Sequence, residues 1–168
     1  MTSNHNQLLY RLKRAMYPRN RPNATARFLN RVSAAQFAAG FLAPRRAVTL
    51  EVTGRRSGRT ISFPLVLVDV EDGRYLVSML GEDVNWVRNV RAAHGQAVLR
   101  HGRSEPVRLT EVDPNDRAPI LRRYLDLAPG ARPHIPVERK APLPEFARIA
   151  DRYPVFRVTT DQHNEPQA

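Results

Sequence analysis

The sequence predicts an α+β domain in which about six strands close into a small barrel with helices on the outside. Segments rich in β-branched residues recur along the chain and are separated by glycine, proline and aspartate, as strands and their turns are. Two or three segments with helical spacing of apolar residues lie among them. A length of 168 residues suits a single domain with one substantial core.

The first two strands are predicted from apolar runs at Ala47–Thr53 and Thr60–Val70. The second run is apolar on both faces from Leu65 to Val68, so we expect it to be central or to line the barrel. Pro64 lacks a backbone donor, and it therefore marks either a bulge or a locally unpaired edge in this strand.

The middle of the chain is predicted to hold a strand, a helix and a second hairpin. Glu71–Gly73 forms a turn, and Asp83 is placed to cap the helix. The hairpin turns around His101-Gly102-Arg103. In chain order, the predicted elements are a strand at Tyr75–Leu80, a helix from about Val84 to Ala93, and strands at Gln96–Arg100 and Glu105–Val112.

The C-terminal part combines helices with a long irregular loop. Asp113 and Pro114 supply a cap and a first-turn proline for a helix that continues to about Leu127. Ala128–Pro144 is rich in proline and is expected to be irregular, and a loop of this length is often a lid or a binding loop. A short helix near Pro144–Ala150 and a last strand at Val155–Thr159 complete the domain.

Positive charge is concentrated at the N-terminus. Residues 1–50 contain nine Lys or Arg residues and no Asp or Glu, so they carry +9 of the formal net charge of +11. An amphipathic helix is expected from Asn23 to Phe41, packed on the barrel or on a membrane. We therefore divide the chain into a basic arm (1–44), a barrel domain (45–160) and a disordered tail (161–168). The arm favours an anionic partner such as a phospholipid surface.

Composition also bounds the location of the protein and the chemistry open to it. The chain has no cysteine and no apolar run near the ~20 residues that span a bilayer. A cytoplasmic location is therefore expected, and peripheral contact of the arm with the inner face of the cell membrane is a hypothesis. The five histidines show no ligand spacing, so no metal site is expected. The sequence leaves open whether the chain forms a homodimer.

The most informative short segment joins the first two predicted strands. Gly54-Arg55-Arg56-Ser57-Gly58-Arg59, which we name the arginine turn, places three arginines around two glycines. Glycine lets backbone N–H groups converge on one point, and arginine binds phosphate or carboxylate. The turn is therefore either an anion site or an ordinary solvated turn on a basic protein.

Two blocks of sequence carry a resemblance to a known family. They are Thr53–Arg59 followed by Pro64-Leu65, and Ser78–Gly81 followed by Asn85–Ala92. Together they resemble the deazaflavin-dependent nitroreductase family, whose members are split β-barrel oxidoreductases of about six antiparallel strands with flanking helices. Many members bind the 8-hydroxy-5-deazaflavin coenzyme (coenzyme F-420). The resemblance is strong from about Val48 to Val112 and looser at both ends.

The resemblance implies a set of cofactor-binding residues. Trp86 and Asn89 share one helix face, so Trp86 could stack on a planar ligand and Asn89 could hydrogen-bond it. From the residues alone Trp86 is a core anchor, whereas the resemblance places it close to the cofactor. The arginine turn would grip the phosphate region, and the strand end at Ser78–Gly81 would pass near the ring system. The implied contacts are Arg55, Arg56, Ser57, Gly58, Arg59, Pro64, Ser78, Met79, Gly81, Trp86 and Asn89.

The chain also departs from the family pattern in ways that leave other ligands open. Ile61 stands where the family often has arginine, Thr60 where it often has proline, and the spacing from Ser78 to Trp86 is short. These differences leave room for another flavin-like ligand. FMN is therefore the second candidate cofactor.

The resemblance implies hydride transfer from the reduced coenzyme to an apolar acceptor, such as a quinone or a nitro compound. The proline-rich loop and the basic arm are expected to form the acceptor side. A proton must reach the reduced product, and Tyr124, His134 and Tyr153 are candidate donors by residue type alone. From a different class, a nucleic-acid-binding module is disfavoured, because aromatic residues make up only 7% of the chain and no strand interleaves them with basic residues.

Overall fold

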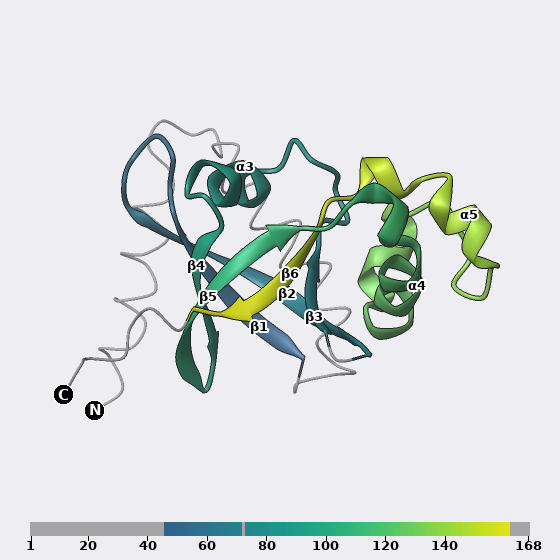
Figure 1. Cartoon of the computed structure of the whole chain (residues 1–168), viewed down its shortest axis with the longest axis horizontal. Helices are drawn as coiled ribbons and strands as arrows, with labels where there is room; N and C mark the ends of the chain where they lie inside the picture. The colour runs from purple at the N-terminus through teal and green to yellow at the C-terminus, as the bar shows by residue number, and fades with distance from the viewer. Residues whose placement is uncertain (1–45, 72, 162–168) are drawn as a thin grey trace, which may run out of the picture.

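The computed structural model describes residues 46–71 and 73–161. Within this part of the chain, six strands form one closed barrel in the order β1-β2-β3-β6-β5-β4, and every pair of neighbours is antiparallel (Figure 1). The strands are β1 (Ala47–Thr53), β2 (Thr60–Val70), β3 (Gly73–Val77), β4 (Gln96–His101), β5 (Arg103–Glu111) and β6 (Val155–Thr160).

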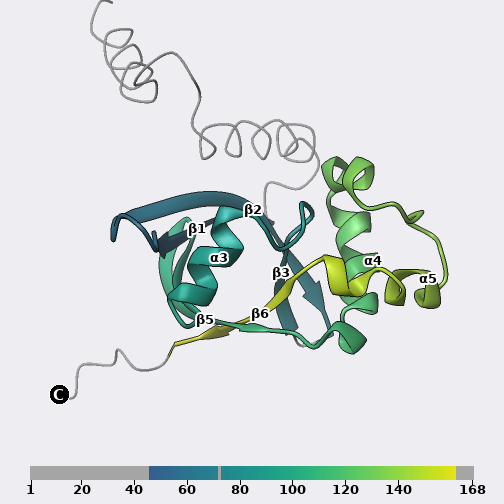
Figure 2. The same ribbon diagram turned by 90° about the horizontal axis from the view of Figure 1, so that it is seen from above.

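The helices lie at two places around the barrel (Figure 2). Helix α3 lies at one end of the barrel, whereas α4 and α5 pack together on the far side of β2 and β3. The α-helices are α3 (Asn85–Ala92), α4 (Ala118–Leu127) and α5 (Leu143–Ala147), and short 3₁₀ helices span Pro114–Asp116, Pro129–His134 and Ala150–Arg152. Within the described residues, no helix is both long and apolar enough to cross a membrane.

The barrel wall explains why β2 tolerates proline. β1 pairs with β2 in a continuous register that includes Thr49 opposite Pro64, so no extra residue is inserted there. β3 begins to pair with β2 only at Leu67. Pro64 therefore falls where one edge of β2 has no neighbouring strand, which confirms the locally unpaired edge and excludes a bulge.

Two hydrophobic cores hold the structure together. The first fills the barrel and is covered by α3, whose Trp86 and Val87 are buried against barrel residues such as Phe156. The second lies between the outer faces of β2 and β3 and the helices α4 and α5, with Phe146 and Leu121 fully buried. Burial of apolar area drives both contacts. The sheet between the cores is therefore buried on both faces at β2, as its double-sided apolar pattern predicts.

The turn between α3 and β4 brings two backbones unusually close. Gly95 has φ +81°, and a Cβ built on it would lie 2.3 Å from the Leu109 carbonyl oxygen. The Leu109 N–H donates to the Gly95 carbonyl oxygen at 2.8 Å. Only glycine satisfies both requirements here, and the result is a tight attachment of α3 to β5.

Several predicted boundaries need correction. β3 ends at Val77 rather than Leu80, because the chain turns sharply at 78–81. Asp83 does not cap α3; it pairs with Arg88, and Val84 precedes the helix without a side-chain cap. The helix predicted from Asp113 is interrupted: Asp113 caps only a 3₁₀ turn, and α4 begins at Ala118. The predictions for the arm (1–44) and for residues 162–168 of the tail lie outside the described residues.

Candidate functional site

The arginine turn is a closed loop at the tip of the β1–β2 hairpin. The Gly54 N–H donates to the Arg59 carbonyl oxygen and the Gly58 N–H donates to the Gly54 carbonyl oxygen, each at 2.8 Å. Gly58 has φ +64°, a conformation that a residue with a Cβ rarely adopts. Arg55 to Arg59 are all exposed. The glycines thus fix a compact turn that presents its arginines to solvent.

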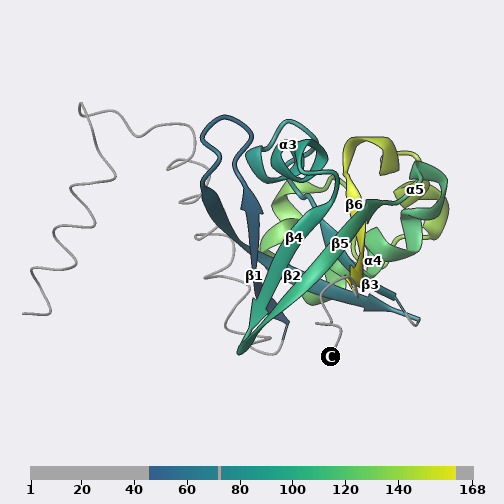
Figure 3. The same ribbon diagram turned by 60° about the vertical axis from the view of Figure 1, so that its left-hand side comes forward.

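Asn89 attaches this turn to α3, and Figure 3 shows the two elements side by side. The Asn89 side chain is 2% exposed, and its Oδ1 accepts from the Arg55 backbone N–H at 3.3 Å and from Arg55 Nη1 at 2.9 Å. Asn85 Oδ1 lies 3.5 Å from the same Nη1. The sequence predicted that both segments belong to one site, and the structure brings them into contact through Asn89.

Two cations of the arginine turn have no partner in the part of the chain that the structure describes. The Arg56 and Arg59 side chains make no hydrogen bond or ion pair with any described residue, and Ser57 Oγ accepts only the Arg59 backbone N–H at 3.3 Å. The Nδ2 group of Asn89 likewise has no described acceptor although it is buried. Exposed cations on a turn whose supporting residue has a buried, unused donor are typical of an anion site.

The turn at 78–81 forms a second compact feature on the other side of α3. Ser78 is 2% exposed, and its Oγ donates to the Gly81 carbonyl oxygen at 2.6 Å. The Ser78 N–H donates to the Pro154 carbonyl oxygen at 2.9 Å, and Gly81 has φ +86°. Leu80 packs against the first core and Met79 against the second. The turn therefore sits at the junction of the two cores.

Trp86 contributes to the barrel core. It is 2% exposed, and its ring centroid lies 5.4 Å from that of Phe156 at an interplanar angle of 59°. This tilted aromatic pair accounts for Trp86 as a core anchor. Contact of Trp86 with a cofactor stays a prediction, as does contact of Pro64, which is half-buried in β2.

The three candidate proton donors lie on the α4 side of the molecule. Tyr124 is 5% exposed in the second core, and burial raises the pKa of its hydroxyl. The Tyr153 hydroxyl donates to the His134 carbonyl oxygen at 2.8 Å, and partial burial raises its pKa. Tyr153 and His134 are thus brought together, but through the His134 main chain rather than its imidazole. Their roles as proton donors stay predictions.

A groove at the base of the arginine turn has the wrong charge for an anion. It has a volume of about 320 Å³ and opens where β1 leaves β4, since these strands pair only at Thr49–Glu51. Its walls include Glu51 and Asp161, which pair with Arg100 and Arg108. It therefore offers no cation to a polyanionic ligand, unlike the exposed side of the arginine turn.

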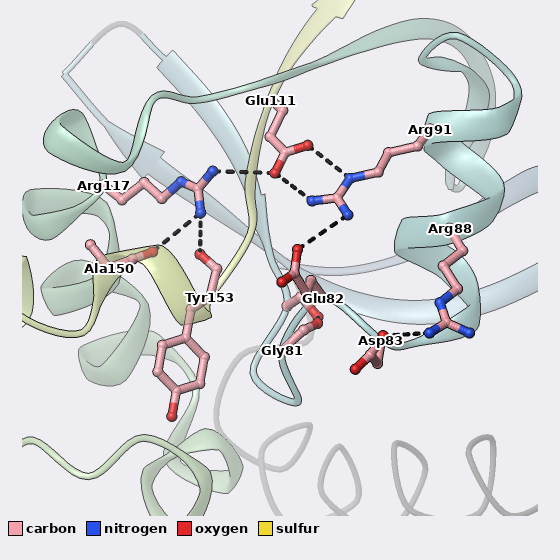
Figure 4. Close-up of polar contacts among 10 residues, drawn as sticks. Gly81, Glu82, Asp83, Arg88, Arg91, Glu111, Arg117, Ala150 and Tyr153 are labelled. Carbon is pink, nitrogen blue, oxygen red and sulfur yellow. Dashed lines mark hydrogen bonds and ion pairs between the residues drawn. The ribbon is translucent and has the colours of Figure 1, made fainter.

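Nothing in the sequence indicated an ion-pair network that joins α3 to the end of β5 and to Arg117. Arg117 is 4% exposed, and it links Glu111 to the carbonyl groups of Ala150 and Tyr153 (Figure 4). Glu111 in turn binds Arg91 of α3. A sequence with 27 basic residues gives no sign of which arginine is buried.

Comparisons with known proteins identify the family of the chain. The model of the F420H2-dependent quinone reductase family matches residues 10–142. The chain belongs to this family. The resemblance to deazaflavin-dependent reductases is thereby confirmed, and the chain is an F420-dependent reductase of the split-barrel type. The comparison with curated proteins finds no match.

Solved structures include several similar folds. The structure titled "F420-H2 Dependent Reductase (FDR-A)" is 26% identical, covers 68% of this chain and 95% of its own, and has a TM-score of 0.44. A protein of unknown function from Agrobacterium tumefaciens is 13% identical over 76% of this chain and 54% of its own, with a TM-score of 0.52. A heme binding protein from Mycobacterium smegmatis is 14% identical over 76% of this chain and 51% of its own, with a TM-score of 0.46.

Proposed function

We propose that this family member binds the deazaflavin coenzyme along the face that runs from the arginine turn, past α3, to the 78–81 turn, and that it reduces a quinone. The observation that carries the proposal is that Arg56 and Arg59 have no partner among the described residues. They belong to a turn that is bonded to Asn89, whose buried Nδ2 group likewise has no acceptor among the described residues. Buried polar groups are nearly always hydrogen-bonded, so an orphaned donor points to a missing ligand.

The residues present fit the coenzyme by charge. Its phosphodiester and glutamate tail make it a polyanion, and Arg56 and Arg59 would hold that tail while Arg55 keeps the turn in place through Asn89. The exposed backbone N–H groups of Arg56 and Ser57, which have no acceptor among the described residues, add donors. Pairing of this kind near solvent is screened by salt, so affinity should fall as ionic strength rises.

The ring system would be faced by Ser78, Met79 and Gly81. The Ser78 hydroxyl donates to the Gly81 carbonyl oxygen, so Ser78 would stabilise the turn rather than act as a proton donor to the substrate. When bound, the reduced coenzyme supplies a hydride, and the protein orients it and excludes water. The chain's own contribution at this end is therefore a fixed turn between two cores.

The acceptor side is proposed to lie toward α4 and the proline-rich loop. In Figures 1 and 2 the arginine turn and the helices α4 and α5 stand at opposite ends of the molecule, with α3 and the 78–84 segment between them. Tyr153 and the 3₁₀ helix Pro129–His134 flank the far end of this path. A quinone fits the family name, and a nitro compound is the alternative acceptor. Peripheral membrane contact by the arm stays a hypothesis, and a homodimer is an alternative that the sequence left open.

Equilibrium dialysis against oxidised deazaflavin coenzyme and against FMN tests the cofactor. We expect retention of the deazaflavin and little retention of FMN, and the reverse result would replace the deazaflavin with FMN. Trp86 is the only tryptophan, so its emission provides a second signal. Quenching during the deazaflavin titration would support contact between Trp86 and the coenzyme, whereas unchanged emission during binding would leave Trp86 as a core anchor.

Single-turnover reduction of acceptors tests the reaction. The reduced coenzyme is mixed anaerobically with the protein and with a menaquinone analogue or a nitroaromatic compound, and oxidation of the coenzyme is followed by absorbance. We expect faster oxidation with the quinone. A protein that binds the coenzyme but accelerates only nitro reduction would contradict the quinone assignment and leave the cofactor assignment intact.

A further inference from the structure

One carboxylate at the end of β5 is shared by two arginines from different parts of the fold. Glu111 accepts from Arg91 Nε at 3.0 Å and from Arg91 Nη2 at 2.8 Å, which is a bidentate contact. On its other side, Glu111 Oε1 accepts from Arg117 Nη2 at 3.2 Å. Figure 4 shows Glu111 between the two guanidinium groups.

Arg117 gives this carboxylate a rigid base. Besides Glu111, its guanidinium donates to the carbonyl oxygens of Val112 at 2.8 Å, Ala150 at 3.2 Å and Tyr153 at 3.3 Å. A guanidinium that is 4% exposed and holds four acceptors has little freedom to move. Glu111 is therefore fixed relative to the segment Ala150–Tyr153.

Arg91 extends the connection to the segment that follows the 78–81 turn. Its Nη1 lies 3.4 Å from Glu82 Oε2. The opposite end of the turn is held by the Ser78 N–H, which donates to the Pro154 carbonyl oxygen. The 78–81 turn is thus held at its start by the main chain after Tyr153 and at its end by the Glu82–Arg91–Glu111 relay.

We infer that this relay positions the 78–81 turn for coenzyme binding, with Glu82, Arg91 and Glu111 as positioning residues. The inference rests on the proposed function, since it assigns the relay to the coenzyme-facing turn. The Glu82 side chain is 60% exposed and that of Arg91 is 41% exposed. Exposed pairs add little to global stability, so the effect of Glu82 is local to the turn.

The neighbouring pair Asp83–Arg88 supplies a matched control. Asp83 is also acidic, also precedes α3 and also pairs with an arginine of α3, but its pair has no link to Glu111 (Figure 4). Glu82→Gln and Asp83→Asn therefore remove the same charge from adjacent positions. A general electrostatic effect on a polyanionic ligand would change both variants equally.

Two measurements on the full chain test the relay. Hydrogen exchange of the 79–83 amides is measured in the free protein, and the Kd of oxidised deazaflavin coenzyme is measured by dialysis. We expect Glu82→Gln to speed the exchange and to raise the Kd about threefold, the scale of one exposed pair. Asp83→Asn should leave the exchange of residues 79–82 and the Kd close to those of the wild type.

A double-mutant cycle adds a readout that a purely structural role would not give. Arg91→Lys keeps the charge but loses the bidentate contact, and the effects of Glu82→Gln and Arg91→Lys on the Kd should be less than additive. Equal Kd values in the Glu82 and Asp83 variants, while the wild type binds, would overturn the relay alone. Failure of the wild type to bind deazaflavin would overturn the proposed function and with it the inference.

Discussion

Two groups of arginines, one in the arginine turn and one around Glu111, differ in how their charge is compensated. In the arginine turn, Arg56 and Arg59 are exposed and have no partner among the described residues. In the network around Glu111, Arg91 of α3 and Arg117 are matched by Glu111, and their other donor contacts also end on oxygen atoms of the protein. The first group is available to bind a ligand, whereas the donors of the second group are already bonded within the protein.

The difference shows how function can be separated from architecture in a protein with many arginines. A buried arginine must be paired, because desolvation of an unpaired charge costs several kcal/mol. An exposed arginine has no such requirement, so an unpaired cluster costs the fold little and remains available for an anion. Compensation, rather than the number of charges, therefore distinguishes the two groups.

The largest effect on stability is expected for the arginines paired with Glu111, which we call the compensated group (Arg91 and Arg117). Arg117→Leu would leave the carbonyls of Val112 and Tyr153 without their donor, would remove one of the two donors to the Ala150 carbonyl, and would leave Glu111 with one cation fewer. We expect a loss of about 3 kcal/mol in the free energy of unfolding, measured by urea titration. Arg122→Ala on the exposed face of α4, the helix that follows Arg117, is the control, and it should change stability by less than about 0.5 kcal/mol. Equal losses would refute the structural role of Arg117.

Asn89 combines a structural role with a proposed role in binding, because it holds in place the turn that is proposed to face the ligand. Asn89→Ala removes the acceptor of both Arg55 donors and should cost about 1–3 kcal/mol of stability while also weakening coenzyme binding. Asn85→Ala removes only a contact of 3.5 Å to the same guanidinium and should change stability by less than about 0.5 kcal/mol. Thermal unfolding compares the two variants. A similar loss in both would mean that the turn is not held by Asn89.

Substitutions in the uncompensated group, Arg56 and Arg59, should weaken coenzyme binding without lowering the stability of the fold. Replacing Arg56 and Arg59 together with Ala is expected to weaken deazaflavin binding at least tenfold, a change of about 1.4 kcal/mol, and to reduce its salt dependence. The double variant Arg122→Ala/Arg123→Ala removes the same charge from exposed positions on α4 and should leave affinity within about twofold of the wild type. Dialysis at two salt concentrations measures both, and an equal loss would indicate a non-specific charge effect.

The sequence predicted the barrel well because its strands carry local signals. The β-branched runs from Ala47 and Thr60 and the turn glycines at 54 and 58 set the first hairpin by themselves. Predicted ends of strands were wrong where a contact with a residue distant in the sequence determines the end. β3 stops at Val77, which pairs with Val155 of β6, because the next partner, Pro154, is far along the chain and has no N–H to donate to the ladder. No local pattern encodes that contact.

The candidate site was predictable in its parts but not in its connections. The sequence located the arginine turn and the Asn89 helix, yet the contact from Asn89 to the Arg55 backbone depends on how the hairpin curls over α3. The burial of Arg117 and the sharing of Glu111 arise only from tertiary packing. Propensity and spacing describe single elements, so they cannot show which of several similar arginines becomes buried.

The smallest effect concerns a third arginine contact, which extends the compensated group to the barrel wall. Arg74 on β3 donates to Glu105 on β5 at 3.0 and 2.7 Å, and Thr160 adds a third contact at 2.8 Å. The hydrogen bond from Arg74 lowers the pKa of Glu105 to about 2. Because the pKa is lower in the folded state than the ~4.3 of an unperturbed glutamate, the pair stabilises the fold above about pH 4.

This stabilisation should be lost as the pH falls from about 4 toward 2, where Glu105 becomes protonated in the folded protein. The pair reaches solvent, so we expect less than about 1 kcal/mol. Urea titrations at pH 5.5, 4 and 3 should show a shallower pH dependence in Glu105→Gln than in the wild type. Glu138→Gln, which changes an exposed glutamate without an ion pair in the described structure, should retain the wild-type slope. If the free energy of unfolding depended on pH equally in the wild type and in both variants, Glu105 would not belong with the compensated arginine pairs. Coenzyme affinity at neutral pH should not change in either variant, because neither glutamate lies beside the arginine turn or the 78–81 turn.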